Sequence, residues 1–259
     1  MSKLRLALLK DVPVKWDLAR NWLTIAAIWK QAAEAGADVF VMPECFLDGY
    51  AVAAKDWTAE RFAQVGQDRS KSSYVAEARR LARDYGMHVT LCLTENRGGH
   101  FYNTALLLDD RGEMVGSYDK THLLDHDARF APGADLPVFP TALGKIGIVI
   151  CADRRWPETV RVLRVRGAEL ILIPSYGMHH EANEWWMRTR AYENEVHLAF
   201  CHPNVGFVCG PRGDILAKLE SNVPDVLVAD VDLSTNADRM LKSRRPELYR
   251  SLDDAAPRS

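Results

Sequence analysis

Three ionisable residues each stand just after an apolar stretch of the sequence, and together they carry the groups needed for acyl transfer. Glu44 follows residues 39–43, Lys120 follows residues 114–119, and Cys151 follows the β-branched run at 146–150. A thiolate attacks a carbonyl carbon, while a carboxylate takes the thiol proton and later returns it to a leaving amine. An ammonium group stabilises the oxyanion. These residue types therefore indicate nucleophilic catalysis by a cysteine.

Each of the three residues also has an ordinary interpretation when it is taken alone. Glu44 could be a solvated loop carboxylate or a helix cap, Lys120 a surface lysine, and Cys151 a thiol buried in the core. In open α/β sheets, however, ligands bind beyond the carboxyl ends of the strands. Three such residues after three expected strands therefore favour one shared site.

The stretches that precede these residues predict a layered α/β fold. Cys151 is expected on a tight turn into a helix that begins near Pro157, which would hold a nucleophile rigidly. Turn sequences at 109–112 and 210–213 predict two hairpins with antiparallel strands. Strands are expected at residues 4–9, 39–42, 89–94, 102–108, 114–118, 146–150, 170–173, 197–201, 205–209, 215–219 and 226–231, and helices at 15–35, 70–85, 158–166 and 184–195.

Length and composition narrow the class of protein. The 259 residues are 47% hydrophobic, which is enough for one large core, and no linker divides them. We therefore expect a single domain over residues 1–259, with 236–259 as an extended C-terminal arm. The net charge of -2 does not favour binding to nucleic acid or to an anionic membrane. The five cysteines are widely spaced and follow no secretion signal, which predicts reduced thiols in the cytoplasm.

The motifs around these residues resemble the carbon–nitrogen hydrolase (nitrilase) superfamily. The resemblance implies a four-layer αββα sandwich with two mixed sheets and a catalytic triad of Glu44, Lys120 and Cys151. It also implies an enzyme without cofactor or metal that pairs through a helical face into a homodimer or a higher homo-oligomer. The matching stretches follow the family's order along nearly the whole chain, at residues 40–44, 118–123, 130–133, 147–158, 167–171, 190–194, 210–213 and 245–249.

The sequence departs from this family pattern at one position. Many members carry a second active-site glutamate between the lysine motif and the Phe-x-Pro-Gly turn, but residues 123–130 contain no glutamate. Asp127 is the nearest substitute, with Asp125 behind it. An aspartate side chain is one methylene shorter, so its backbone would have to lie closer to the same partner. The substitution points to an altered substrate pocket.

Further residues are expected to contact the oxyanion or the substrate. The N–H of Ala152, directly after the nucleophile, is expected to donate to the oxyanion. The resemblance places substrate contacts in the loop after strand 170–173, which carries Tyr176 and His179. Arg154 could bind a substrate carboxylate, although pairing with Glu158 or lying on a helix face is the more ordinary expectation.

Two other groups of residues allow more than one interpretation. Glu193 follows Arg190 by three residues, which predicts an ion pair within a helix, while support of Lys120 or Cys151 stays open. His179 and His180 lie side by side, and Cys201 precedes His202. Neither pair has the spacing of a metal site, so no metal is expected.

The sequence thus predicts a thiol amidohydrolase that needs no cofactor and cleaves a small amide or an N-carbamoyl compound. Hydrolysis of a nitrile is the nearest alternative, so the expected partner is a small amide, ureido or nitrile substrate. A catalytically silent member of the family that binds a metabolite is a second alternative. A redox protein that uses Cys201 and Cys209 is a third, disfavoured because the two cysteines lie on either side of an expected strand.

Overall fold

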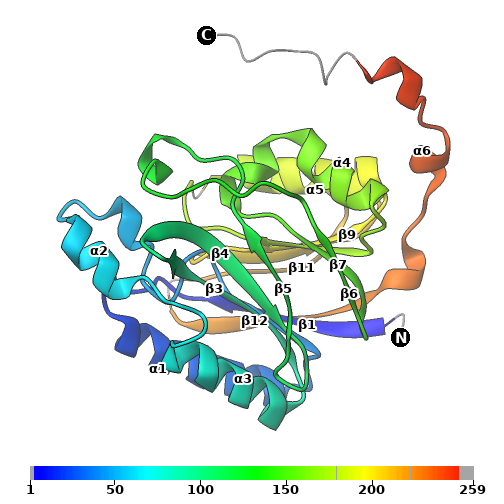
Figure 1. Ribbon diagram of the computed structural model, residues 1–259. Coiled ribbons are helices and arrows are strands. Elements are labelled where there is room, and N and C mark those ends of the chain that lie inside the picture. The colour runs from blue at the N-terminus through cyan, green and yellow to red at the C-terminus, as the bar shows by residue number, and fades with distance from the viewer. Residues whose placement is uncertain (1–2, 179, 222, 251–259) are drawn as a thin grey trace.

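Two six-stranded sheets form the centre of the molecule, and helices cover the outer face of each (Figure 1). The structure is a computed structural model and describes residues 3–178, 180–221 and 223–250. The two mixed sheets and the helices outside them confirm the predicted four-layer αββα sandwich. Each sheet contains three neighbouring parallel strands, and Glu44 and Cys151 each stand just beyond one of them.

The first sheet carries Glu44 and Lys120 beyond its strand ends. Strands β1, β2 and β3 run parallel, with Ala7 opposite Phe40 and Phe40 opposite Val89, and the remaining neighbours are antiparallel. The strands, in spatial order, are β12 (Asp225–Asp232), β1 (Lys3–Lys10), β2 (Val39–Val41), β3 (His88–Arg97), β4 (His100–Leu108) and β5 (Met114–Asp119).

The second sheet carries Cys151. Strands β7, β8 and β9 run parallel, with Gly147 opposite Ile171 and Ile171 opposite Leu198. The strands, in spatial order, are β11 (Ile215–Glu220), β10 (Val205–Cys209), β9 (His197–Cys201), β8 (Leu170–Pro174), β7 (Gly144–Ile148) and β6 (Val138–Thr141). Hairpins join β4 to β5 and β10 to β11, as the turn sequences predicted.

The outer layers are formed by amphipathic helices. Helices α1 (Leu18–Glu34) and α3 (Ser73–Tyr85) cover the first sheet, and α4 (Pro157–Val165) and α5 (Ala182–Asn194) cover the second (Figure 1). Helix α1 buries Ile25, Ile28 and Trp29 at helical spacing, as a helix packed on a sheet must. Two shorter helices, α2 (Ala59–Val65) and α6 (Arg239–Lys242), lie at the periphery.

The main core lies between and around the two sheets. Large side chains that are less than 2% exposed include Phe40 from the first sheet and Phe200 and Phe207 from the second. Strand β1 contacts β9 and β10 across the interface between the sheets. This packing fixes how the two sheets lie relative to each other, and so fixes the distance between residues that follow strands in different sheets.

Element boundaries differ from the predicted ones for identifiable reasons. The first helix begins at Leu18 rather than at residue 15, because the Asp17 side chain caps it by accepting from the Arg20 N–H. Helix α2 and strand β6 were not predicted, since both are short. Within the described residues, no helix has the length and apolar character needed to cross a bilayer.

Candidate active site

Glu44 stands two residues beyond Met42, where the chain leaves β2, and its side chain is completely buried. Its Oε1 accepts hydrogen bonds from Lys120 Nζ at 2.9 Å and from Asn103 Nδ2 at 2.7 Å. Its Oε2 has no hydrogen-bond partner among the described residues. A buried carboxylate oxygen without a partner is rare and is available to take up a proton.

Lys120 follows β5 directly and is also buried, with an exposed fraction of 1%. Its ammonium group pairs with Glu44 and with Asp127, whose Oδ2 lies 2.5 Å from Nζ. Burial alone would lower the pKa of Lys120, but the neighbouring charges of Glu44, Cys151 and Asp127 raise it above the ordinary value. The raised pKa favours the charged ammonium, which is suited to hold an oxyanion.

Asp127 occupies the place where the sequence lacks a glutamate. A 3-10 turn at Asp125–Asp127 brings its backbone close enough for the shorter side chain to reach Lys120. Its other oxygen, Oδ1, accepts from the Tyr50 hydroxyl at 2.6 Å. The structure thus brings Asp127 into the cluster, while Asp125 begins the turn behind it.

Cys151 stands three residues beyond the end of β7, at the start of the 3-10 turn Cys151–Arg155 that leads into α4. Its backbone φ is 46°, in the left-handed region that non-glycine residues seldom adopt. Such a conformation at a sharp strand-to-helix turn is typical of a nucleophile held in a fixed direction. Pro157 occupies the first helical turn of α4, as predicted.

The surroundings of Cys151 decide how its thiol can react. Burial raises the pKa of Cys151, and the Glu44 carboxylate raises it further. Arg154, Lys120 and a hydrogen bond from the Tyr176 backbone lower it, but the net pKa stays above that of an ordinary thiol. The resting group is therefore the neutral thiol, and attack on a carbonyl requires that a base remove its proton. Glu44 is a carboxylate close enough for its charge to act on the thiol, and its Oε2 has no partner among the described residues.

Arg154 lies elsewhere than the ordinary expectation placed it. It does not pair with Glu158, which is exposed at the start of α4. Its guanidinium is 1% exposed and donates from Nη1 to Cys151 Sγ at 3.3 Å. Nε and Nη2 both donate to Asn183 Oδ1, at 3.1 and 2.7 Å. A buried cation thus touches the nucleophile and has no carboxylate partner among the described residues.

The other predicted site residues differ in whether they lie beside the buried cluster. Ala152 is buried directly after the nucleophile, and its N–H has no acceptor among the described residues. Tyr176 stacks on Tyr50 at 4.7 Å between ring centroids, beside the cluster. His179 lies outside the described residues. Glu193, on α5, pairs with Arg190 at 3.2 Å, and among the described residues its carboxylate contacts neither Lys120 nor Cys151.

Three residues that contact the site were missed from the sequence. Asn103 lies on β4 and is 1% exposed, and it hydrogen-bonds to Glu44. Tyr50 contacts Asp127, and Asn183 holds Arg154. A polar Asn103 within an apolar strand was a usable signal, since buried polar side chains need partners. The contacts of Tyr50 and Asn183 depend on folding and left no pattern.

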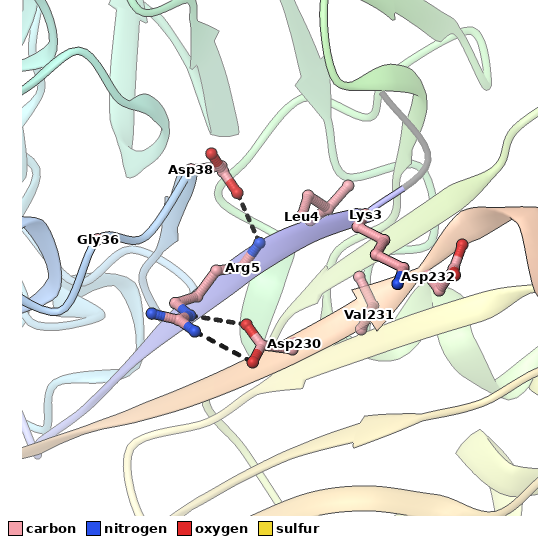
Figure 2. A pocket seen from close by; sticks show the side chains of 8 residues that line it. All are labelled: Lys3, Leu4, Arg5, Gly36, Asp38, Asp230, Val231 and Asp232. Atoms are coloured by element: carbon pink, nitrogen blue, oxygen red, sulfur yellow. Dashed lines mark hydrogen bonds and ion pairs between the residues drawn. The ribbon is translucent and has the colours of Figure 1, made fainter.

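A hollow of about 570 Å³ lies away from this cluster (Figure 2). It is lined by the start of β1, the residues before β2 and the end of β12. These residues lie at the amino end of β2, whereas Glu44 follows its carboxyl end. Several of its charged groups are already engaged, because Arg5 pairs with Asp230 at 2.7 Å and the Arg5 backbone N–H donates to Asp38 at 2.6 Å. The hollow therefore offers no reactive group comparable with the buried cluster.

Comparisons with known proteins assign the chain to a family. The profile of the carbon-nitrogen hydrolase family matches residues 5–238. A protein of Pseudomonas protegens named "Hydrolase in pqqF 5'region" is 31% identical, over 97% of this chain and 93% of that protein. Omega-amidase NIT2 of Danio rerio is 30% identical, over 96% of this chain and 97% of that protein.

A solved structure of similar fold adds chemical information. The amidase from Nesterenkonia sp. AN1, as a glutamate-to-glutamine variant, has a TM-score of 0.81 at 28% identity and covers 96% of each chain. That structure shows covalent addition of the acetamide moiety of fluoroacetamide at its active-site cysteine. With the family profile matched across most of its length, the present chain belongs to the carbon-nitrogen hydrolase family and is a hydrolase of non-peptide C–N bonds.

Proposed function

We propose that this enzyme hydrolyses a small amide or N-carbamoyl compound through a thioester on Cys151. The observation that carries the proposal is the buried cluster around the thiol. It combines a carboxylate with one unpartnered oxygen, an ammonium held by two carboxylates, and a nucleophile in left-handed backbone. The omega-amidase and amidase names of the similar proteins support an amide as substrate.

In the first half of the reaction, Cys151 Sγ attacks the carbonyl carbon while Glu44 Oε2 takes the thiol proton. Lys120 Nζ and the Ala152 N–H donate to the oxyanion. The tetrahedral intermediate then collapses, the C–N bond breaks, and Glu44 returns the proton to the departing nitrogen. The products of this half are ammonia or an amine and a thioester on Cys151.

In the second half, a water molecule attacks the thioester carbonyl while Glu44 takes one of its protons. Lys120 and the Ala152 N–H again hold the oxyanion. The C–S bond breaks, the sulfur is protonated from Glu44, and the carboxylic or carbamic acid leaves. Glu44 thus acts as base and then as acid in each half, and the enzyme returns to its starting protonation state.

Arg154 supports a preference for substrates that carry an anionic group. A guanidinium has five N–H donors, and three of them are used by Asn183 and Cys151. Buried charges are normally paired, so the remaining donors suit a substrate carboxylate. Because Nη1 lies 3.3 Å from Sγ, that carboxylate would have to stand close to the scissile carbonyl. Tyr176 and Tyr50 would line the side of the same pocket.

Ammonia release from a panel of amides, ureido compounds and nitriles tests the function, each with and without a nearby carboxylate. We expect turnover of amides or ureido compounds, with the Cys151→Ala variant reduced below about one part in 10⁴. Turnover of nitriles alone would assign the alternative activity. Binding without turnover of any compound, or full activity of Cys151→Ala, would overturn the proposal.

We further infer a homo-oligomer in the cytoplasm. The outer face of α4 and α5 exposes large apolar side chains, including Trp185 and Tyr192. All five cysteines are free thiols, including buried Cys201 and Cys209, which supports a reducing compartment.

A further inference from the structure

We propose that Asp153 is a positioning residue that ties the nucleophile turn to the segment carrying Lys120. The proposal rests on the function proposed above, because it concerns the spacing of the thiol and the ammonium that hold one carbonyl group. Asp153 is completely buried two residues after Cys151 and is not needed to move a proton. Its role would lie in geometry alone.

The Oδ2 atom of Asp153 holds its own turn and reaches the other sheet. It accepts from the Ile150 N–H at 2.9 Å, directly before the nucleophile. It also accepts from the Tyr118 hydroxyl at 2.7 Å. Tyr118 lies on β5, two residues before Lys120. One oxygen therefore joins the residue before Cys151 to the strand that directly precedes Lys120.

The Oδ1 atom makes the same connection on the other side of Lys120. It accepts from Thr121 Oγ1 at 2.9 Å and from the His122 N–H at 2.8 Å. His122 Nδ1 lies 2.8 Å from the same oxygen, and a carboxylate facing it leaves the ring nitrogen to donate. The His122 ring also stacks on Trp156, which follows the turn, at 4.1 Å between centroids. Lys120 is thus bracketed by contacts to one side chain.

This connection matters because the two catalytic groups come from different sheets. Lys120 follows β5 in the first sheet, and Cys151 follows β7 in the second. A shift of one sheet edge against the other would separate the sulfur from the ammonium, and a misplacement of about 1 Å can cost roughly 100-fold in rate. Asp153 resists that shift through bonds to both segments. The Thr159 hydroxyl adds a bond to the Asp153 carbonyl at 3.0 Å, which anchors its backbone.

The type of side chain at 153 is constrained by its partners. All five bonds to the two oxygens come from donors, and an ionised carboxylate is an acceptor at both oxygens. An asparagine of the same shape would place an NH₂ group against donors at one end. Asp153→Asn therefore removes the connection on one side while keeping the volume of the side chain.

The test compares Asp153→Asn with the wild-type enzyme in steady-state kinetics and in thermal unfolding. We expect kcat to fall about 100-fold, with KM changed less than about threefold and the protein still folded at the assay temperature. Labelling of Cys151 by fluoroacetamide, followed by mass spectrometry, should slow in parallel. Glu195→Gln is the matched control. It removes a carboxylate charge that is 3% exposed and bound to Arg239 and the Met240 N–H, remote from the site.

Milder variants keep the test decisive if Asp153→Asn does not fold. Tyr118→Phe and Thr121→Val each remove one donor to Asp153, and each should lower kcat more than KM. Their effects should be less than additive with Asp153→Asn, because all three break one connection. Unchanged kcat and labelling in folded Asp153→Asn, or full kcat in both milder variants, would overturn the proposal. Failure of the proposed function would appear separately, as a wild-type enzyme without turnover.

Discussion

At Cys151, burial and one neighbouring charge oppose two other neighbouring charges in their effect on the thiol. Burial and Glu44 disfavour the thiolate, whereas Arg154 and Lys120 favour it, and the pKa of Cys151 stays raised. In the proposed mechanism the thiol reacts only when Glu44 removes its proton, which would protect it from indiscriminate reaction. The proposal gives this task to Glu44 Oε2, which has no hydrogen-bond partner among the described residues.

The charges around Cys151 predict the direction in which two substitutions shift its pKa. Loss of the negative charge in Glu44→Gln should lower the pKa of Cys151, and loss of the positive charge in Arg154→Met should raise it. Alkylation by iodoacetamide rises with pH as thiolate forms, so its midpoint should move down in the first variant and up in the second. Mass spectrometry of the Cys151 peptide across a pH series measures both. Shifts in the same direction would contradict the assigned charges.

That Glu44, Lys120 and Cys151 lie near one another could be predicted from residues, but the place of Arg154 could not. Glu44, Lys120 and Cys151 each follow an expected strand, and ligands in open α/β folds bind beyond the carboxyl ends of the strands. Arg154 is buried because Asn183, on α5, accepts two of its hydrogen bonds. That contact joins residues far apart in sequence, so local pattern could only suggest the pairing with Glu158.

Among the structural elements, a short turn against β5 helps to place Lys120. Gly133 lies in this turn, and its N–H donates to the Lys120 carbonyl at 2.9 Å. A Cβ atom added at Gly133 would stand 2.2 Å from the carbonyl oxygen of Asp119. Backbone contacts this close leave no room for a methyl group, so the turn requires glycine.

We expect Gly133→Ala to destabilise the protein by about 1–3 kcal/mol and to lower kcat, because Asp119 and Lys120 must move. Gly206→Ala, in β10, is the matched control, since its added Cβ would lie 3.6 Å from Leu227, an ordinary contact. Denaturant unfolding and kinetics measure both variants. Equal stability and activity of the two variants would contradict the role given to the turn.

The regular elements were largely predictable, because long apolar strands and periodic helices leave strong patterns. Helix α2 has seven residues and β6 has four, with Pro140 inside the strand. Neither length is enough to separate a pattern from chance. The 3-10 turn that carries Asp127 was equally invisible, since its position is set by contacts with Tyr50 and Lys120.

At the scale of the whole molecule, the two outer layers differ in what they expose. Trp185 and Tyr192 stand seven residues apart on α5 and are 57% and 55% exposed, and Val165 at the end of α4 is 51% exposed. Residues seven apart lie on the same face of a helix. Apolar groups gathered on one layer are typical of a surface that another subunit covers.

We expect the wild-type protein to sediment as a dimer or larger assembly, and Trp185→Asp combined with Tyr192→Asp to shift it toward the monomer. Leu23→Asp is the control, because Leu23 is 70% exposed on α1, in the opposite outer layer. Sedimentation velocity distinguishes these states. A monomeric wild type would contradict the inferred assembly. Loss of the assembly in Leu23→Asp, but not in the double variant, would place the interface on the layer that contains α1.

The proposed reaction requires a covalent bond between Cys151 and the acyl group of the substrate. Peptide mass spectrometry of enzyme quenched in acid during turnover of an amide tests this bond most directly. We expect the mass of the acyl group on the peptide that contains Cys151, in a form that hydroxylamine removes. Turnover with Cys151 unmodified at every quench time, together with an active Cys151→Ala variant, would contradict the account.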